Sequence, residues 1–279
     1  MKKLSFTKMQ GTGNDFVLLD ALRQPVRVTP ALARRLCDRR FGVGADQVLV
    51  LAKSAVADFK MLIYNADGSQ VEMCGNGIRC LARYAFDRGH TKKRRMTVET
   101  LAGVRTPVIE RGAVRVDMGA PILDAALIPT KAKGRVIDQP FSLKAPKNEV
   151  NLEMTCVSMG NPHAVIFVDD ADAVPLEEWG PVIEHSPFFP KRTNVEFVQM
   201  KNPDQARVRV WERGSGATLA CGTGACAVGV AGVLTGRFHR AVTLSLPGGD
   251  LNVEWAADNR VYLTGPAAFV FDGHFDSYL

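Results

Sequence analysis

The chain contains no long apolar run, and none of its six cysteines forms a Cys-x-x-Cys pair. A membrane-spanning helix needs about 18 consecutive apolar residues, so the first absence argues against a membrane protein. The second absence argues against a structural metal site, because such sites usually contain closely spaced cysteines. Residues 1–3 begin like a signal peptide, but no apolar segment follows them. We therefore expect a cytoplasmic protein whose cysteines are free thiols.

The charge balance is mild, with 35 Lys and Arg against 29 Asp and Glu. The basic clusters at 34–35, 39–40 and 92–95 are not interleaved with aromatic residues, and no recognised nucleic-acid-binding module accompanies them. A solvated basic face is therefore favoured over a nucleic-acid partner. Gly11-Thr12-Gly13 precedes a predicted strand instead of joining a strand to a helix, so it is not a dinucleotide fingerprint. We expect no nicotinamide, pyridoxal phosphate or metal cofactor.

Short strands and two helices are predicted along a chain whose 279 residues suit one large domain or two ordinary ones. Strand patterns lie at 17–19, 60–64 and 207–211, with a hairpin over 243–255. The helices are predicted at 76–88 and 223–234, and each stops at a glycine. The second helix is small and apolar on every side, as in a helix enclosed by a core. The first has a charged side formed by Arg79, Arg83, Asp87 and Arg88.

Both helices follow a Cys-Gly-x-Gly motif, at Cys74 and at Cys221, which are 147 residues apart. The same offset aligns residues 13–14 with 160–161, 47 with 194, and the two glycine stops. We interpret this as a duplicated α/β domain, although a coincidence between two glycine-rich turns is the alternative.

Each Cys-Gly-x-Gly motif offers a sulfur beside the positive end of a helix. That end can bind an anion such as a carboxylate, and its field favours a thiolate. A buried structural cysteine is the simpler explanation for one motif, but two copies suit a particular reaction. Inverting a stereocentre needs a base on one face of a carbon and an acid on the other. Cys74 and Cys221 could supply both if they face each other.

Polar residues at strand edges and turns fit a small zwitterionic substrate. Each asparagine alone could equally be a turn residue. Glu212 and Arg213 follow a strand and could bind an ammonium and a carboxylate, although a solvated ion pair is as good a reading. The asparagines are Asn14, Asn65, Asn76, Asn161 and Asn194.

The chain resembles the diaminopimelate epimerases, cofactor-independent amino-acid epimerases of lysine and peptidoglycan precursor biosynthesis. The resemblance rests on a set of segments spread over nearly the whole chain. They are residues 8–16, 40–47, 65–68, 72–80, 160–163, 194–197, 211–214 and 220–226.

This resemblance implies that Cys74 and Cys221 are the acid–base pair that interconverts LL- and meso-diaminopimelate. Cys74 is then the proton donor and Cys221 the acceptor in the LL-to-meso direction. His163 and Glu212 match positions that tune the cysteines. The implied substrate contacts are Asn14, Gln47, Asn65, Gly75, Asn76, Asn161, Asn194, Glu212, Arg213, Gly222 and Thr223.

The resemblance also implies a mixed α+β fold of two pseudo-symmetric halves. Each half is a curved sheet around a central helix, with the active site in the cleft between them. The halves are expected to comprise residues 1–119 with 267–279, and 120–266. A homodimer is expected, although Phe271 stands where some members have a tyrosine that supports the dimer. A second departure is Ala217, where many members have a glutamate, so one polar contact is in doubt.

Two other functions remain open from the sequence. One is another two-cysteine racemase, of the proline or hydroxyproline type, which would have no second amino-acid head group to bind. The other is a thiol redox protein in which Cys74 and Cys221 form a reversible disulfide.

Overall fold

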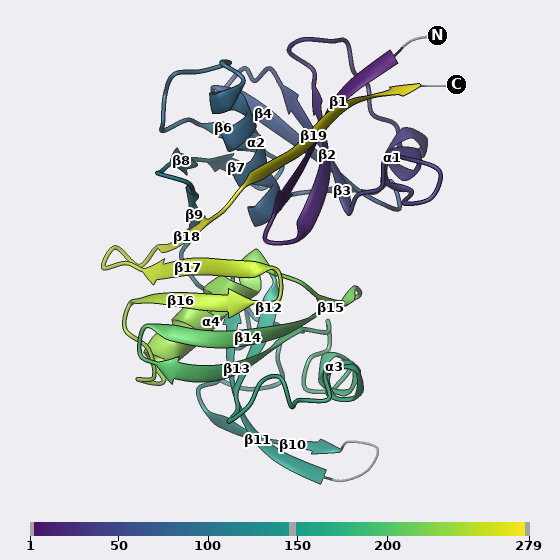
Figure 1. The fold of residues 1–279 in the computed structure, drawn as a ribbon. Coiled ribbons are helices and arrows are strands. Elements are labelled where there is room, and N and C mark those ends of the chain that lie inside the picture. The colour runs from purple at the N-terminus through teal and green to yellow at the C-terminus, as the bar shows by residue number, and fades with distance from the viewer. Residues whose placement is uncertain (1–2, 145–148, 277–279) are drawn as a thin grey trace. The chain divides into compact units, whose positions relative to one another are not determined.

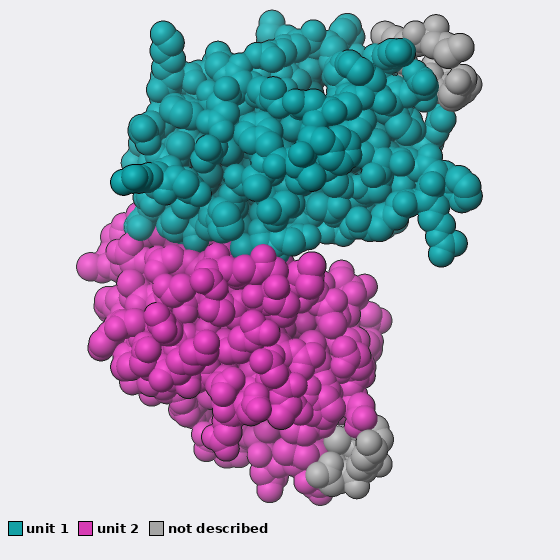
Figure 2. All heavy atoms as spheres, viewed as in Figure 1, with its two compact units in different colours: residues 1–117, 264–279 teal, residues 118–263 magenta. Residues whose placement is uncertain are grey.

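The computed structural model describes residues 3–144 and 149–276, which form a mixed α+β fold (Figure 1). The chain divides into two compact units, residues 1–117 with 264–279 and residues 118–263 (Figure 2). The halves expected from the sequence differ from these units by two residues at one junction and three at the other. Here the first is called unit 1 and the second unit 2.

Unit 1 contains a sheet with the order β19-β1-β2-β3-β4-β6-β7, on which β5 pairs with β4. Its helices are α1 (Pro30–Cys37) and α2 (Gly75–Asp87). Strands β8 and β9 pair with each other in an antiparallel arrangement. The strands are β1 (Lys3–Gly11), β2 (Asn14–Asp20), β3 (Gln47–Ala52), β4 (Phe59–Asn65), β5 (Gln70–Val71), β6 (Val98–Thr100), β7 (Gly103–Arg105), β8 (Val108–Ile109), β9 (Val114–Gly119) and β19 (Ala268–Asp276).

Unit 2 contains a sheet with the order β10-β11-β12-β13-β14-β16-β17-β18, on which β15 pairs with β14. Its helices are α3 (Leu176–Glu184) and α4 (Gly222–Leu234). The strands are β10 (Gln139–Lys144), β11 (Glu149–Ser158), β12 (Pro162–Phe167), β13 (Asn194–Asn202), β14 (Gln205–Glu212), β15 (Gly216–Thr218), β16 (Ala241–Leu246), β17 (Gly249–Trp255) and β18 (Val261–Gly265).

The two units repeat the same path, as the 147-residue offset predicts. In unit 1, β2 and β3 are parallel and Phe16 lies opposite Gln47. In unit 2, β12 and β13 are parallel and His163 lies opposite Asn194, so the register is identical at that offset. In both units an antiparallel strand, a short strand and another parallel strand follow in the same order. The predicted pair of duplicated, sheet-rich halves is confirmed.

Helix α4 is the centre of unit 2, because every residue from Gly224 to Gly232 is buried. It contacts five strands, β11, β12, β13, β16 and β17. Small residues allow this close packing: a Cβ added at Gly232 would lie 1.9 Å from Cδ2 of Phe238. The prediction of an enclosed apolar helix is confirmed.

Helix α2 also contacts the strands of its own unit, and its charged side is only partly exposed. Arg79 is fully buried. Its guanidinium donates to the carbonyls of Gly75 and Pro266 and to the hydroxyl of Thr12, at 3.2–3.3 Å. These acceptors replace water around the charge. Arg83 forms a partly exposed ion pair with Asp87.

The close packing of α4 predicts that Gly232→Ala destabilises the chain. In an uncrowded helix the same change would stabilise by about 1 kcal/mol. Here the added methyl overlaps the Phe238 ring, so we expect the free energy of unfolding to fall by about 1–3 kcal/mol. Urea denaturation measures the change, and an unchanged or increased free energy would contradict this packing.

Candidate active site

Cys74 is the residue that caps the N-terminus of α2. Its backbone is extended (φ −137°, ψ 120°), and its Sγ accepts a hydrogen bond from the Gly77 amide at 3.4 Å. The side-chain amide of Asn14 donates to the same sulfur at 3.8 Å. The sulfur therefore lies at the positive end of a helix with two N–H groups directed at it. Such surroundings favour a thiolate and accommodate an anion.

The polar residues predicted in unit 1 lie at one end of its sheet. Asn14 begins β2 and Gln47 begins the parallel strand β3, while Asn65 ends β4 opposite Gln47. The Gln47 amide donates to Oδ1 of Asn65 at 2.8 Å, and Asn65 donates to Ser69 at 3.0 Å. Within the described residues, Oδ1 of Asn14 and Oε1 of Gln47 are buried and accept no hydrogen bond. Two such acceptors suit a ligand that brings donors, such as an ammonium group.

Cys221 occupies the equivalent position at the N-terminus of α4. Its Sγ accepts from the Gly224 amide at 3.4 Å and lies 3.4 Å from the hydroxyl of Thr223. Burial raises the pKa of this thiol well above its usual range, and the carboxylates of Glu212 and Glu196 raise it further. The bonds from Thr223 and Gly224 act in the opposite direction but are smaller causes. Cys221 is therefore a thiol at rest.

Glu212 ends strand β14 within reach of Cys221. Burial raises the pKa of this carboxyl, against the opposing effects of a hydrogen bond from Thr218, the charge of His163 and a hydrogen bond with Cys221. The Thr218 hydroxyl donates to Oε1 of Glu212 at 2.6 Å. Ala217, the departure noted in the sequence, is exposed next to this threonine. Thr218 supplies a polar contact to Glu212 beside that exposed alanine.

His163 is buried on β12, with Glu196 and Asn161 as its partners. Its Nδ1 lies 2.7 Å from Oε1 of Glu196, and its Nε2 lies 3.1 Å from Oδ1 of Asn161. Asn194 is also buried, and both ends of its amide bind backbone: the carbonyl of Pro162 at 2.7 Å and the amide of Arg213 at 2.9 Å. Asn194 thus holds the Arg213 backbone, while the Arg213 side chain is exposed and donates to the carbonyl of Lys191.

The structure thus gathers the predicted residues into two sets, each around one helix start. Gly75 and Asn76 in the first turn of α2 are buried, as is Gly222 in the first turn of α4. Sequence reasoning assigned no role to Glu196 or Thr218. Glu196 carried a signal, an acidic residue within the apolar stretch 195–198, but Thr218 carried none.

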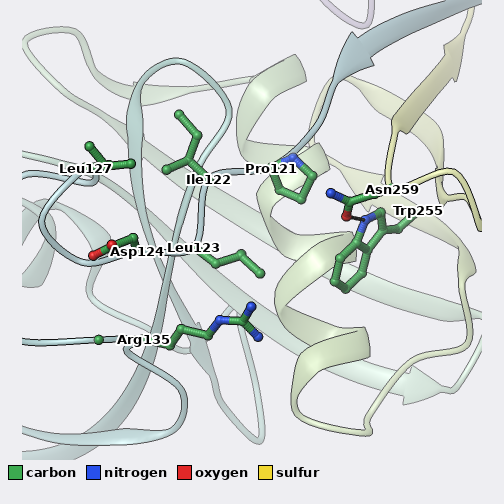
Figure 3. A pocket seen from close by; sticks show the side chains of 9 residues that line it. Pro121, Ile122, Leu123, Asp124, Leu127, Arg135, Trp255 and Asn259 are labelled. Carbon is green, nitrogen blue, oxygen red and sulfur yellow. Dashed lines mark hydrogen bonds between the residues drawn. The ribbon is translucent and has the colours of Figure 1, made fainter.

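The hollow shown in Figure 3 lies elsewhere in unit 2. It has a volume of about 650 Å³ and contains none of the predicted site residues. Trp255 forms part of its wall and donates its indole N–H to Asn259 at 3.1 Å. Within residues 3–144 and 149–276 no helix is long and apolar enough to cross a membrane.

Solved structures show the class of fold. The chain superimposes on a hydroxyproline epimerase from Agrobacterium vitis with a TM-score of 0.69 and 14% identity, covering 99% of this chain and 91% of that one. A PhzF-family phenazine biosynthesis protein from Bacillus anthracis gives a TM-score of 0.71 and 15% identity, covering 99% and 100%. The chain therefore shares its fold with both proteins.

Sequence comparison then defines the family. The diaminopimelate epimerase family model matches residues 6–123 and 155–270. A diaminopimelate epimerase from Moorella thermoacetica is 53% identical over 98% of this chain and 99% of its own length. One from Picosynechococcus sp. is also 53% identical, over 97% and 98%. The chain belongs to the diaminopimelate epimerase family and is an isomerase, as the resemblance predicted.

The raised pKa of Cys221 predicts slow alkylation at neutral pH. Because a smaller fraction is thiolate than for a free cysteine, we expect its reaction with iodoacetamide to be at least about tenfold slower at about pH 7.5. The midpoint of the rise in rate with pH should lie above that of the unfolded chain. Mass-spectrometric peptide mapping measures it, with the urea-unfolded chain as the control. A midpoint below that of the unfolded chain would contradict the electrostatics described here.

Proposed function

We propose that this chain interconverts LL- and meso-diaminopimelate, with Cys74 and Cys221 as the acid–base pair. The proposal rests on one observation. Each duplicated unit contains a cysteine at a glycine-lined helix N-terminus. Two such devices are what an inversion at carbon requires, because one sulfur removes the α-proton and the other returns a proton on the opposite face. The proposal requires both sulfurs to reach the same substrate carbon.

The groups around each sulfur support distinct roles. The amide N–H groups at the two helix starts would bind the α-carboxylate and stabilise negative charge as the proton leaves. Asn14, Gln47 and Asn65 are proposed to contact the substrate from unit 1. Asn76 is proposed to do so from the first turn of α2, together with Gly75.

In unit 2 the proposed contacts come from Asn161, Asn194, Glu212 and Arg213, together with Gly222 and Thr223 at the start of α4. Glu212 and Arg213 would bind the ammonium and carboxylate of the second amino-acid head group. His163 and Glu212 would tune Cys221 through their charges.

The protonation states of the two thiols determine which direction of the reaction a given form of the enzyme catalyses. Because Cys221 is protonated at rest, it is ready to donate a proton, which is its role in the meso-to-LL direction. The LL-to-meso direction needs the opposite state, with Cys221 as the accepting thiolate and Cys74 as the donor. Both sulfurs must stay reduced, so we further infer a cytoplasmic location, in lysine and peptidoglycan precursor biosynthesis.

Single cysteine variants test this assignment. Cys74→Ala and Cys221→Ala should each reduce the conversion of LL- to meso-diaminopimelate by about 10³-fold or more, because removing either an acid or a base stops the inversion. Chiral chromatography follows the product under reducing conditions. The matched control is Cys226→Ala, another buried cysteine on α4, which should retain activity. Residual turnover above a few per cent in either active-site variant, or an inert reduced wild type, would contradict the proposal.

We also propose that the chain is a homodimer that pairs through β19. This strand lies at the edge of the unit 1 sheet and exposes Val270 and Phe271, which are 55% and 49% accessible. An exposed apolar edge strand is a surface that another chain commonly covers. The Phe271 ring packs edge-on against Phe6 and is thereby held in place. It gives a second copy of this chain a fixed apolar surface to pack against.

Phe271→Asp tests the dimer. A charge on this edge should shift the chain from dimer to monomer in sedimentation velocity at micromolar concentration. Phe41→Asp is the matched control, since Phe41 is exposed elsewhere in unit 1 and should leave the oligomeric state unchanged. A dimer that survives Phe271→Asp would contradict the proposed surface.

A further inference from the structure

A buried chain of hydrogen bonds runs from Glu196 through His163 to Asn161 beneath the start of α4. Glu196 and His163 have no solvent-exposed surface. Oε1 of Glu196 lies 2.7 Å from Nδ1 of His163, and Nε2 lies 3.1 Å from Oδ1 of Asn161. A Cβ at Gly224 would come within 2.6 Å of the same Glu196 oxygen, so the carboxylate packs against the first turn of the helix that Cys221 caps.

Unit 1 shows which residues the fold needs at the positions equivalent to His163 and Glu196. The residues 147 positions earlier are Phe16 and Leu49, which are fully buried on β2 and β3 in the same strand register. Leu49 packs beside Gly77 as Glu196 packs beside Gly224. An apolar pair therefore fills this space in one unit. Unit 2 instead buries a histidine and a carboxylate, which are costly to remove from water. Folding alone gives no reason for that exchange.

The hydrogen-bond partners define the protons on the ring. Each ring nitrogen of His163 faces an oxygen, Oε1 of Glu196 at Nδ1 and Oδ1 of Asn161 at Nε2, so both nitrogens have an acceptor for a proton. A ring that makes both bonds carries a proton on each nitrogen and a positive charge. The carboxylates that act on the ring are Glu196 on β13 and Glu212 on β14. Glu196 in turn acts on the Cys221 thiol at the start of α4 and on the Cys156 thiol on β11.

We propose that Glu196 is a positioning residue of the epimerase site: its carboxylate holds His163 doubly protonated, and His163 in turn fixes the amide of Asn161. The carboxylate does not exchange a proton with substrate. It keeps a fixed positive ring near Glu212, and it leaves the NH₂ of Asn161 directed away from His163 for a ligand. The inference rests on the proposed function only in that Asn161 and Cys221 act on substrate.

The charge has a specific task in turnover. When Cys221 is to accept the α-proton, it must first exist as a thiolate in a buried site that disfavours one. The imidazolium offsets the two carboxylates that raise the pKa of Cys221, because it is paired with Glu196 and acts on Glu212. In unit 1, Phe16 and Leu49 provide no such charge, so the two sulfurs have unlike partners although their helix starts are alike.

The ring protons provide a direct test that needs no substrate. In ¹⁵N-histidine-labelled wild type at about pH 7.5, where a free histidine is mostly neutral, we expect both nitrogens of His163 to carry protons. In Glu196→Gln one nitrogen should lose its proton. The His163→Gln spectrum assigns the signals. Glu184→Gln is the matched control, because Glu184 is also buried in unit 2 but binds Trp211 and Gly214, so the His163 signals should be unchanged. A bare His163 nitrogen in the wild type, or two protons in Glu196→Gln, would overturn the inference.

Kinetics and stability separate positioning from simple packing. Glu196→Gln should lower kcat about tenfold and change KM by less than about twofold, the size seen when a partner that orients a functional histidine is removed. Glu196→Asp, which keeps the charge, should recover part of the loss.

The double variant His163→Phe/Glu196→Leu copies the unit 1 pair. It should keep or raise the melting temperature while losing activity. A clear drop in melting temperature would mean that the pair serves folding, and would overturn the inference. A wild type that is inert on diaminopimelate would instead contradict the proposed function, and the ring-proton result would still decide this inference.

Discussion

The packing of one small, apolar helix against the strands of its sheet determines much of this structure. In unit 2 the glycines of α4 let Phe238 and Val253 approach its backbone, so the helix has almost no freedom to shift. Its N-terminus is thereby held in place, and the amide of Gly224 meets the sulfur of Cys221. A reactive thiol at a helix start is useful only if that start does not move. The helix packing supplies this rigidity, and the same arrangement recurs at Cys74.

Duplication gives the molecule two units with the same strand path, and a few differences in sequence make the two units chemically unequal. The registers of the central strands are identical at an offset of 147 residues. At the position of a phenylalanine in unit 1, unit 2 has His163, and at the position of Leu49 it has Glu196. The shared strand path places a cysteine at the start of a helix in each unit, and the buried polar pair makes the surroundings of the two thiols differ.

Much of this organisation was predictable because its signals are local. A cysteine, a glycine turn, an apolar segment and a stopping glycine follow one another within about 16 residues, so the helices and the repeat could be found. The burial of Arg79 could not be predicted, because its acceptors, Thr12 and Pro266, are far away in the sequence. The hydrogen-bond partners of Glu196 and Asn194 could not be predicted either, since they lie on neighbouring strands or loops. Pairings of that kind depend on strand register, which spacing alone does not reveal.

The central claim is that two different thiols act on opposite faces of one carbon. The most direct measurement is the position of deuterium when LL-diaminopimelate is incubated in D₂O and sampled by NMR at low conversion. If one thiol removes the proton and the other delivers a solvent-derived deuteron, deuterium appears in the inverted product and the remaining LL isomer keeps its α-proton. Deuterium washed into the unreacted LL isomer as fast as product forms would show a single base working on one face, and would contradict the account.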